Sequence, residues 1–282
     1  MTSPAVTLGL ALPGQGSVTE IVEEARRAAA IGFDVVLVPD HLGYTAPLPP
    51  LVAVAAAVPT VKVSNLVLNA AFYRPALLAR DLASVDSASG GRLIISLGTG
   101  FVEQEFTLAG LPFPRPAARV KLLTEHVIQI RALLSDPAHI PPPVQVPPPI
   151  MVAGAGDKLL TMAAHHADIV AIAAMGDEAN LAERVAFVRA QAGTRIADII
   201  LAFSFFQVSI DDSADLAMLR MLAPTAADVE LRQLATFLGG PVEAAAERVR
   251  RLQNQLGISY FTFNKTPGTS WDTFEKLVAA LK

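Results

Sequence analysis

Short apolar segments alternate with amphipathic ones along the whole chain, and this alternation constrains the fold more than any other feature. Each apolar segment runs through consecutive hydrophobic positions, as strands buried on both faces do, and a segment with helical spacing follows each of them. The predicted strands are residues 5–13, 33–40, 61–71, 92–100, 150–156, 168–174, 199–210 and 258–264. The predicted helices are residues 18–32, 50–58, 75–91, 116–134, 157–166, 177–192, parts of 212–236, 241–256 and 271–281.

The number and order of these units predict the architecture. Strands that alternate with helices are typical of a parallel sheet whose outer face the helices cover. Eight strand–helix units of roughly 35 residues match the size of a closed (β/α)8 TIM barrel, an α/β fold. An open doubly wound sheet is the alternative, but such sheets usually have fewer strands. The Pro-rich stretch 135–149 is interpreted as an extended connection, so residues 1–282 are predicted to form a single domain.

Bulk composition narrows the classes of function. Hydrophobic residues make up 52% of the 282 positions and charged residues 17%, with a net charge of −4. Nucleic-acid binding needs a positive surface and is therefore not expected. The absence of cysteine excludes disulfides, thiolate metal sites and cysteine nucleophiles. The N-terminus lacks the basic region of a signal peptide, and the most membrane-like run is short and flanked by proline, which predicts a soluble, cytoplasmic protein.

The residues that end the strands are the candidates for function, because the active sites of such barrels lie at the carboxyl ends of their strands. Asp40 and His41 follow the second predicted strand, and Asn69 ends the third. Gln207, Asn264 and Lys265 belong to the last two strand ends. Glycine and other small residues follow the strands between them, namely Gly98, Thr99 and Gly100, then Gly154, Ala155 and Gly156, and then Ala174, Met175 and Gly176.

This set of residues favours a site that binds a large cofactor and no metal. Asp40 and His41 alone are too few to hold a divalent cation. Glycine allows the backbone to come close to a ligand, and residues 154–158 lead directly into a helix, whose first N–H groups attract phosphate. We therefore predict a site that holds a planar, phosphorylated cofactor, which itself carries out the chemistry.

Structural interpretations of the same residues remain open. The two glycine-containing turns could join strands to helices without binding a ligand, and Asp40 could cap a turn. His126, His139, His165 and His166 are interpreted as structural. Glu103 and Glu105 could be acids of a first helical turn, which suit the helix dipole, or could act above the fourth strand.

The chain resembles the luciferase-like monooxygenase superfamily, and within it the actinobacterial oxidoreductases that use the deazaflavin coenzyme F420. The segments that carry the resemblance cover most of the chain in the expected order. They are ARRAAAIGFDVVLVPDHLG, LVLNAAFYRPALLARDLASVDSASGGRLIISLGTGFVEQEF, AGLPF, the run from PPPIMVAGAG to AAHHADIV, and GGPVEAAAERVRRLQNQLGISYFTF. The block from FYRPALLAR through SGGR to LGTG is the most specific of them.

The resemblance implies a bacterial luciferase-like barrel that binds the deazaflavin ring in its mouth. It places a non-prolyl cis peptide at Leu66–Val67 behind the ring, with Asp40 and Thr99 at the polar edge of the ring. Asn69 and Gly100 join this predicted cofactor site. Ala153, Gly154, Ala155 and Gly156 correspond to the phosphate-binding turn, and Ala174, Met175 and Gly176 to the second wall of that pocket. His41 corresponds to the imidazole near the reacting carbon, and a homodimer is expected.

The chain also departs from the pattern of sugar-phosphate dehydrogenases in this family. Those enzymes carry a glutamate directly after the glycine motif of the fourth strand, where this chain has Phe101, and Tyr44 only approximates their aromatic residue after the histidine. The hypothesis is therefore hydride transfer between the deazaflavin and an unidentified carbonyl, imine, activated alkene or alcohol, with His41 moving the proton. The alternatives are an FMN-dependent two-component monooxygenase, a non-catalytic deazaflavin carrier or sensor, and a phosphate-binding barrel without a redox role.

Overall fold

The structure, a computed structural model, describes residues 6–210 and 215–282 and contains a closed parallel barrel. Within these residues eight barrel positions follow one another in sequence order, and the first strand pairs with the last. The strands are β1 Thr7–Ala11, β2 Val35–Val38, β3 Lys62–Asn65 with its continuation β4 Leu68–Asn69, β5 Leu93–Gly98, β6 Ile150–Gly154, β7 Ile169–Ile172, β8 Ile200–Phe205 and β11 Ile258–Asn264. The (β/α)8 prediction is confirmed, because an open doubly wound sheet would leave two edge strands paired on one side only.

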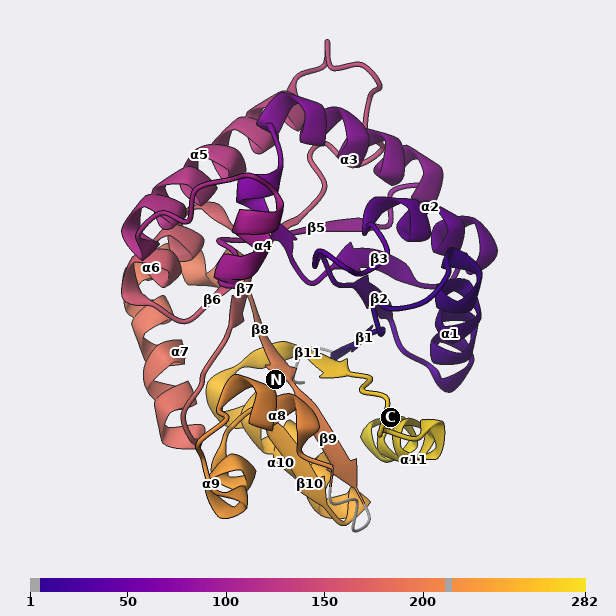
Figure 1. Cartoon of the computed structure of the whole chain (residues 1–282), viewed down its shortest axis with the longest axis vertical. Coiled ribbons are helices and arrows are strands. Elements are labelled where there is room, and N and C mark those ends of the chain that lie inside the picture. Colours follow the sequence, from indigo (N-terminus) through magenta and orange to yellow (C-terminus); the bar gives the residue numbers. More distant parts are fainter. Residues whose placement is uncertain (1–5, 211–214) are drawn as a thin grey trace.

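Helices form a ring around this barrel (Figure 1). The helices of the ring are α1 Val18–Ile31, α2 Leu48–Ala57, α3 Pro75–Ser89, α5 Pro116–Ser135, α6 Asp157–His166, α7 Glu178–Ala192, α10 Val242–Leu256 and α11 Trp271–Leu281. Short helices and 3-10 turns lie between them, namely η1 Ala70–Phe72, α4 Glu103–Leu108, η2 Gly193–Asp198, α8 Ala217–Leu222 and α9 Asp228–Gln233. In Figure 1, α4 lies inside the ring, over the strands.

The expected helix signals act at the ends of α1. The Ser17 hydroxyl accepts a hydrogen bond from the Glu20 backbone N–H, and the Glu20 carboxylate accepts one from Ser17 N in return. This capping box satisfies two of the first N–H groups of the helix. Gly32 ends the helix at φ +110°, a conformation that costs glycine little because it has no Cβ.

Alternation along the strands divides the core into an outer and an inner part. Outward residues such as Leu10 and Val36 pack against the helices. Inside the barrel, bulky side chains such as Val35, Met151 and Ile169 occupy the strand starts, and small residues occupy the strand ends. These small residues include Ala11, Gly98, Ala153 and Ala171. The barrel is therefore filled by side chains at its amino-terminal end and lined by small ones at its carboxyl end.

The third predicted strand, residues 61–71, is interrupted. Ser64 pairs with Ile94 and Leu68 with Leu97, so the chain advances by four residues on one strand and by three on its partner. The extra residue is a bulge. It contains the Leu66–Val67 peptide bond, which is cis, as the family resemblance implied.

The seventh predicted strand, residues 199–210, is wrong as a single strand. Its first part is β8, but Gln207–Ile210 leaves the barrel as β9 and pairs in parallel with β10 Phe237–Gly240. This small sheet and the helices α8 and α9 enclose a separate apolar cluster of Leu216, Leu219, Leu231 and Phe237. The strand β10 escaped prediction because a four-residue run ending in two glycines has little strand pattern. Residues 212–214 of the predicted helical segment lie outside the described residues.

The Pro-rich connection runs from α5 to β6 without helix or strand, as expected, and contains two cis X–Pro bonds, Ile140–Pro141 and Val146–Pro147. Its middle is attached to the barrel by Asp86, whose carboxylate accepts hydrogen bonds from the backbone N–H groups of Val144 and Gln145. Across residues 6–210 and 215–282, we find no helix with the length and hydrophobicity that a membrane span requires.

Candidate active site at the barrel mouth

Asp40 is buried directly after β2 and is held by two hydrogen bonds. Its Oδ2 accepts one from Asn69 N at 3.0 Å and one from the Tyr73 hydroxyl at 3.0 Å. Burial raises the pKa of the Asp40 carboxyl above its ordinary value, and these two donors and His41 oppose the shift. Burial and the adjacent Asp40 also raise the pKa of Tyr73, so its hydroxyl remains a proton donor. Asp40 is thus fixed in place between β2 and β4.

His41 stands beside Asp40 and pairs with a carboxylate from another element. Its Nδ1 lies 2.7 Å from Glu105 Oε1, and Glu105 is in the first turn of α4. A carboxylate can only accept, so the imidazole Nδ1 carries the proton of this hydrogen bond. Glu105 is the better shielded partner, with 13% of its side chain exposed against 33% for His41. The Nε2 of His41 is consequently the ring nitrogen left for proton transfer.

Two aromatic rings flank His41. The ring of Tyr44 meets the imidazole edge to face at a centroid distance of 5.4 Å, and the ring of Phe101 does so at 6.4 Å. Phe101 is 69% exposed, although it belongs to a residue type that normally packs in the core. Its position follows from Gly100, which turns the chain at φ +64° directly after β5.

The ends of β4 and β5 bring several predicted residues together. Asn69 is buried and lies against Gly100, where a Cβ atom would come within 2.3 Å of Asn69 Nδ2. The Asn69 Nδ2 group itself is buried without a hydrogen-bond partner. Val67 covers Gly98, where a Cβ would lie 2.5 Å from Val67 Cγ2. Close approach of backbone and side chain thus requires both glycines, and a donor remains available at this position.

The other residues predicted on this side are near these contacts. Leu66 packs on the inner barrel cluster, as does Ala153 from β6. Thr99 is half-buried between Gly98 and Gly100. Leu66 itself belongs to the cis bond of the bulge, and its neighbour Val67 covers Gly98.

In the turn from β6 to α6, the groups that can contact a ligand belong to the backbone. Gly156 caps α6 at φ −75° and ψ 147°, and no side chain accepts from the first N–H groups of the helix. A Cβ on Gly156 would meet nothing within 4 Å, whereas one on Gly154 would lie 2.5 Å from Leu159. Asp157 in the first turn would repel an anion, but Arg184 binds its carboxylate at 2.5 Å. The N-terminus of α6 therefore remains suited to a phosphate; Ala155 is half-buried between the two glycines.

The end of β7 lies beside this turn, since Ala173 N donates to Gly154 O at 2.9 Å. Met175 is exposed, as expected for a residue predicted to line the second wall of the cofactor pocket. Ala174 is buried in the main core, so its side chain faces the helices, and a contact of Ala174 with the cofactor stays a prediction. The Gly176 carbonyl accepts from Ala235 N at 2.8 Å and thereby connects this rim to the β9–β10 sheet.

Two of the three remaining strand-end residues, Gln207 and Lys265, have structural contacts that the sequence did not reveal. Gln207 was expected at the rim but is buried in β9, where its side chain accepts from Met218 N and donates to Asp215. Lys265 contacts Glu24 at 3.5 Å and the Trp271 ring at 5.2 Å. Asn264 retains a buried Oδ1 without a partner at the end of β11.

The residues present fit a deazaflavin. Unpartnered buried polar atoms of Asn69 and Asn264 belong to the ends of barrel strands, and an uncapped helix start with open space at Gly156 can take a phosphate. In the described part of the chain, no group of three or more His, Cys, Asp or Glu side chains is arranged so that it could hold a metal ion.

Sequence reasoning identified His41 but not its partner. Glu105 was an open alternative, since an acid in a first helical turn is also explained by the helix dipole. Tyr73 lies in the segment from Asn69 to Arg74 that was predicted to follow the third strand, but no sequence pattern connects its hydroxyl with Asp40. His126 supports that loop, with Nε2 2.9 Å from the Tyr73 carbonyl oxygen, in agreement with its predicted structural role.

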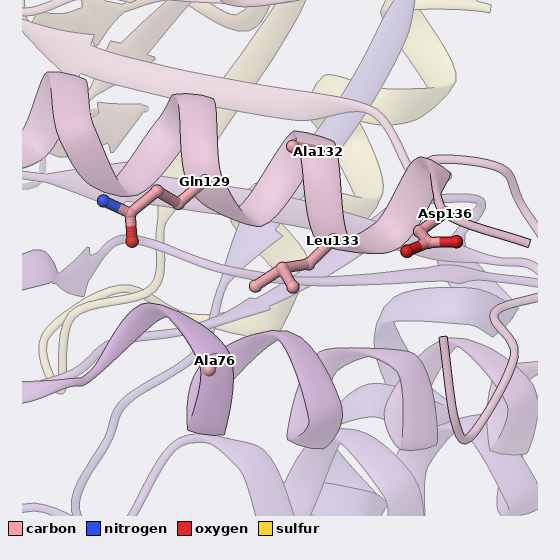
Figure 2. A pocket seen from close by; sticks show the side chains of 5 residues that line it. All are labelled: Ala76, Gln129, Ala132, Leu133 and Asp136. Atoms are coloured by element: carbon pink, nitrogen blue, oxygen red, sulfur yellow. The ribbon is translucent and has the colours of Figure 1, made fainter. Parts of the chain in front are cut away.

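A hollow elsewhere on the molecule is separate from this site. Figure 2 shows it between α3 and α5, on the outside of the barrel. Ala76 comes from α3, and the other lining residues, Gln129, Ala132, Leu133 and Asp136, come from α5 or its end. Its lining includes no residue predicted for the site.

Comparison with known proteins agrees with this geometry. The family profile described as luciferase-like monooxygenase matches residues 4–259. An F420-dependent glucose-6-phosphate dehydrogenase of Amycolatopsis mediterranei (strain U-32) is 34% identical over 123 residues. That match covers 40% of this chain and 37% of the relative, so the chain spans less than half the length of the curated protein.

Solved structures share the fold over nearly the whole chain. An F420-dependent secondary alcohol dehydrogenase, in complex with an F420–acetone adduct, matches with a TM-score of 0.82 at 19% identity, over 99% of this chain and 100% of the other. A long-chain alkane monooxygenase also matches with a TM-score of 0.82 at 14% identity, over 99% and 92%. At such identities these likenesses are statements about the fold.

Proposed function

The chain belongs to the luciferase-like monooxygenase family, and we propose that it is an oxidoreductase that transfers a hydride between coenzyme F420 and a small organic substrate. The observation that carries the proposal is the hydrogen bond of 2.7 Å between His41 and Glu105 at the barrel mouth. Hydride transfer to a carbonyl or from an alcohol moves a proton as well, and this pair supplies a group that can take or give it.

The choice of cofactor rests on the relatives and on the fit of the mouth. Relatives at 34% identity are named as F420-dependent enzymes. The cis bond at Leu66–Val67, the donor on Asn69 and the uncapped start of α6 suit a tricyclic ring with a phosphorylated tail. When bound, the deazaflavin accepts or donates the hydride.

His41 would handle the proton that accompanies the hydride. Glu105 holds Nδ1, so Nε2 points its lone pair at the substrate and can accept the hydroxyl proton of an alcohol. In the reverse direction, protonated Nε2 donates to the oxygen of a carbonyl. Glu105 fixes the tautomer and the ring orientation, as second carboxylates commonly do for catalytic imidazoles.

Asp40 and Asn69 would position the cofactor. Asp40 is held by Asn69 N and the Tyr73 hydroxyl, so its free oxygen can accept from an N–H on the polar edge of the ring. Asn69 Nδ2 can donate to a carbonyl on the same edge. The small residues at the carboxyl ends of the strands allow a flat ring to lie close to the barrel backbone.

The test begins with the purified protein and the two cofactor classes. Titration with coenzyme F420 and, separately, with FMN is followed by absorbance, because flavin and deazaflavin bands differ. We expect saturable binding of F420, followed by oxidation or reduction of its chromophore when a panel of ketones and alcohols is added. Absence of binding to either cofactor would contradict the proposal. Tight F420 binding without turnover across the panel would favour a carrier or sensor.

An FMN-dependent monooxygenase is the second candidate, and the observation in its favour is the family match itself together with the fold shared with an alkane monooxygenase. Only FMN supports oxygen activation. Oxygen consumption with reduced FMN, and none with reduced F420, would favour the FMN-dependent monooxygenase over the F420-dependent oxidoreductase.

We further propose that the protein is a cytoplasmic homodimer, as expected from the family resemblance. Sedimentation velocity of the purified chain tests the dimer, and cell fractionation tests the location. A monomer at micromolar concentration would contradict the first part.

A further inference from the structure

The approach to His41 is lined by exposed apolar side chains. Phe101 is 69% exposed, Leu42 is 41% exposed and Tyr44 is 38% exposed. The rings of Phe101 and Tyr44 both lie beside the imidazole, at interplanar angles of 86° and 70°. Single exposed apolar residues are ordinary on a protein surface, but two exposed rings beside one candidate acid–base residue, with exposed Leu42 next to it in the chain, mark a ligand site.

Phe101 contributes little to the folded core in this position. A ring with most of its surface in water gains free energy when a ligand covers it, since burying a phenylalanine side chain is worth about 1.5–3 kcal/mol. The flat faces of Phe101 and Tyr44 would bind hydrocarbon or another ring better than hydroxyl groups. The geometry beside His41 therefore selects for apolar surface.

The charges around His41 point in the same direction. The fixed charges next to it are the carboxylates of Glu105 and Asp40. The rim segments that carry these residues, 39–47 and 99–105, contain no lysine or arginine. Lys265, which follows β11, is taken up by Glu24 and the Trp271 ring, with 11% of its side chain exposed. A phosphorylated substrate bound against these two segments would face two carboxylates and no cation from either segment, which is unfavourable.

Resting on the proposed function, we propose that the substrate is an uncharged, largely apolar alcohol or ketone, whose hydrocarbon part packs on Phe101 and Tyr44. In the oxidative direction the carbinol C–H bond breaks and its hydride passes to the oxidised deazaflavin, while the hydroxyl proton passes to His41 Nε2. The products are a ketone, reduced deazaflavin and a protonated imidazole. Phe101 is thus a specificity-determining residue.

Binding of three probes tests this inference without turnover. Cyclohexanol is apolar and neutral, glucose is polar and neutral, and glucose 6-phosphate is polar and anionic. Saturation-transfer NMR on the cofactor-free protein, and again with F420 added, gives the affinity for each probe. We expect cyclohexanol to bind in preference to both sugars, and glucose 6-phosphate to bind weakest because of Glu105 and Asp40.

Substitutions of Phe101 test whether this ring provides the affinity for cyclohexanol. Phe101→Ala should weaken cyclohexanol binding about tenfold, in line with the apolar surface removed. Phe101→Leu should retain most of the affinity. Ile128→Ala, which removes an apolar side chain 48% exposed on α5, is the matched control and should change nothing. Because Phe101 is mostly exposed, none of these variants threatens folding.

Two results would overturn the inference. One is stronger binding of glucose 6-phosphate than of cyclohexanol, and the other is unchanged cyclohexanol binding in Phe101→Ala. Each of these two results can be distinguished from failure of the proposed function. A protein that binds F420 and oxidises glucose 6-phosphate refutes only the substrate class, whereas a protein that binds cyclohexanol through Phe101 but ignores F420 refutes the proposed function.

Discussion

The two sides of the barrel mouth are built on different principles. On the side of β2, β4 and β5, ionisable side chains meet at hydrogen-bond distance, with Asp40 on the Tyr73 hydroxyl and His41 on Glu105. On the side of β6 and β7, the chain presents glycine, alanine and the open start of α6.

The difference assigns a different task to each side. An ionisable side chain can accept or release a proton, whereas a backbone N–H group can only donate a hydrogen bond to a ligand. Removing the side chain of His41 or Glu105 from the first side should therefore reduce turnover and leave cofactor binding intact. Adding a side chain to the second side should weaken cofactor binding and leave the proton step intact.

The largest expected effect comes from the imidazole. His41→Gln keeps a polar side chain that can still donate to Glu105, but it removes the group that exchanges the proton. Turnover on a true substrate should fall by about 10²–10⁴-fold, the usual contribution of general acid–base catalysis. The affinity for F420, measured by absorbance titration, should stay the same. Unchanged turnover would remove His41 from the mechanism.

A smaller loss is expected from the carboxylate behind it. Glu105→Gln retains an oxygen that accepts from His41 Nδ1 but loses the charge that stabilises a protonated imidazole. We expect kcat to fall about 10–100-fold with little change in KM, as for second partners of functional histidines. Glu103→Gln is the matched control, because Glu103 lies in the same helical turn and is exposed. Equal effects of the two substitutions would argue against a specific role of Glu105.

Two glycines of one turn probe the other side of the mouth. Gly156→Val adds a side chain where a Cβ meets nothing within 4 Å and the backbone is at φ −75°, so the fold should be unaffected. The side chain would occupy space that a phosphate needs, and we expect F420 affinity to fall about tenfold with an unchanged Tm.

Gly154→Val serves as the comparison for that experiment. A Cβ there would lie 2.5 Å from Leu159 Cδ2, so overpacking should lower the free energy of unfolding by about 1–3 kcal/mol. Thermal melts separate the two variants. A large drop in Tm for Gly156→Val, or none for Gly154→Val, would reverse the roles that we assign to these positions.

The smallest expected effect concerns stability and pH at Asp40. Burial raises the pKa of this carboxyl in the folded protein above its unfolded value, so the folded state holds the proton more strongly. Its contribution to stability is therefore greatest at low pH and declines as pH rises from the unfolded pKa through the folded one.

Asp40→Asn removes this decline and keeps an oxygen that can accept from Asn69 N and Tyr73. Near neutral pH the variant should be more stable than the wild type, on the order of 1 kcal/mol. The difference should shrink as pH falls through the window between the two pKa values. Urea unfolding over a pH series measures it, and a difference that grows toward low pH would contradict the assigned direction.

Local patterns allowed most of the barrel to be predicted. Most barrel strands are runs of mainly apolar residues, a pattern that depends on no long-range contact. The signals at Ser17, Gly32, Pro75 and Pro116 mark helix ends through their own backbone preferences. The glycine-containing turns at the ends of the strands could be predicted for the same reason. The division of residues 199–210 into two strands after Phe205 could not be predicted, because their pattern is that of one apolar strand. The second half leaves the barrel because it pairs with β10.

The candidate site was predictable in part. Asp40, His41 and Asn69 could be found because the ends of parallel strands meet on one rim. Glu105 and Tyr73 could not be assigned, since their partners lie 64 and 33 residues away in sequence. No periodicity connects residues so far apart.

The sequence by itself determined the order of strands and helices, the barrel that such an order closes into, and the rim on which polar residues gather. These features depend on hydrophobic spacing and on backbone preferences, which act over a few neighbouring residues. Only the tertiary structure decided which carboxylate meets His41, which hydroxyl holds Asp40, and that Phe101 stands exposed beside the imidazole. Those contacts depend on distances between elements, and the distances exist only once the barrel has closed.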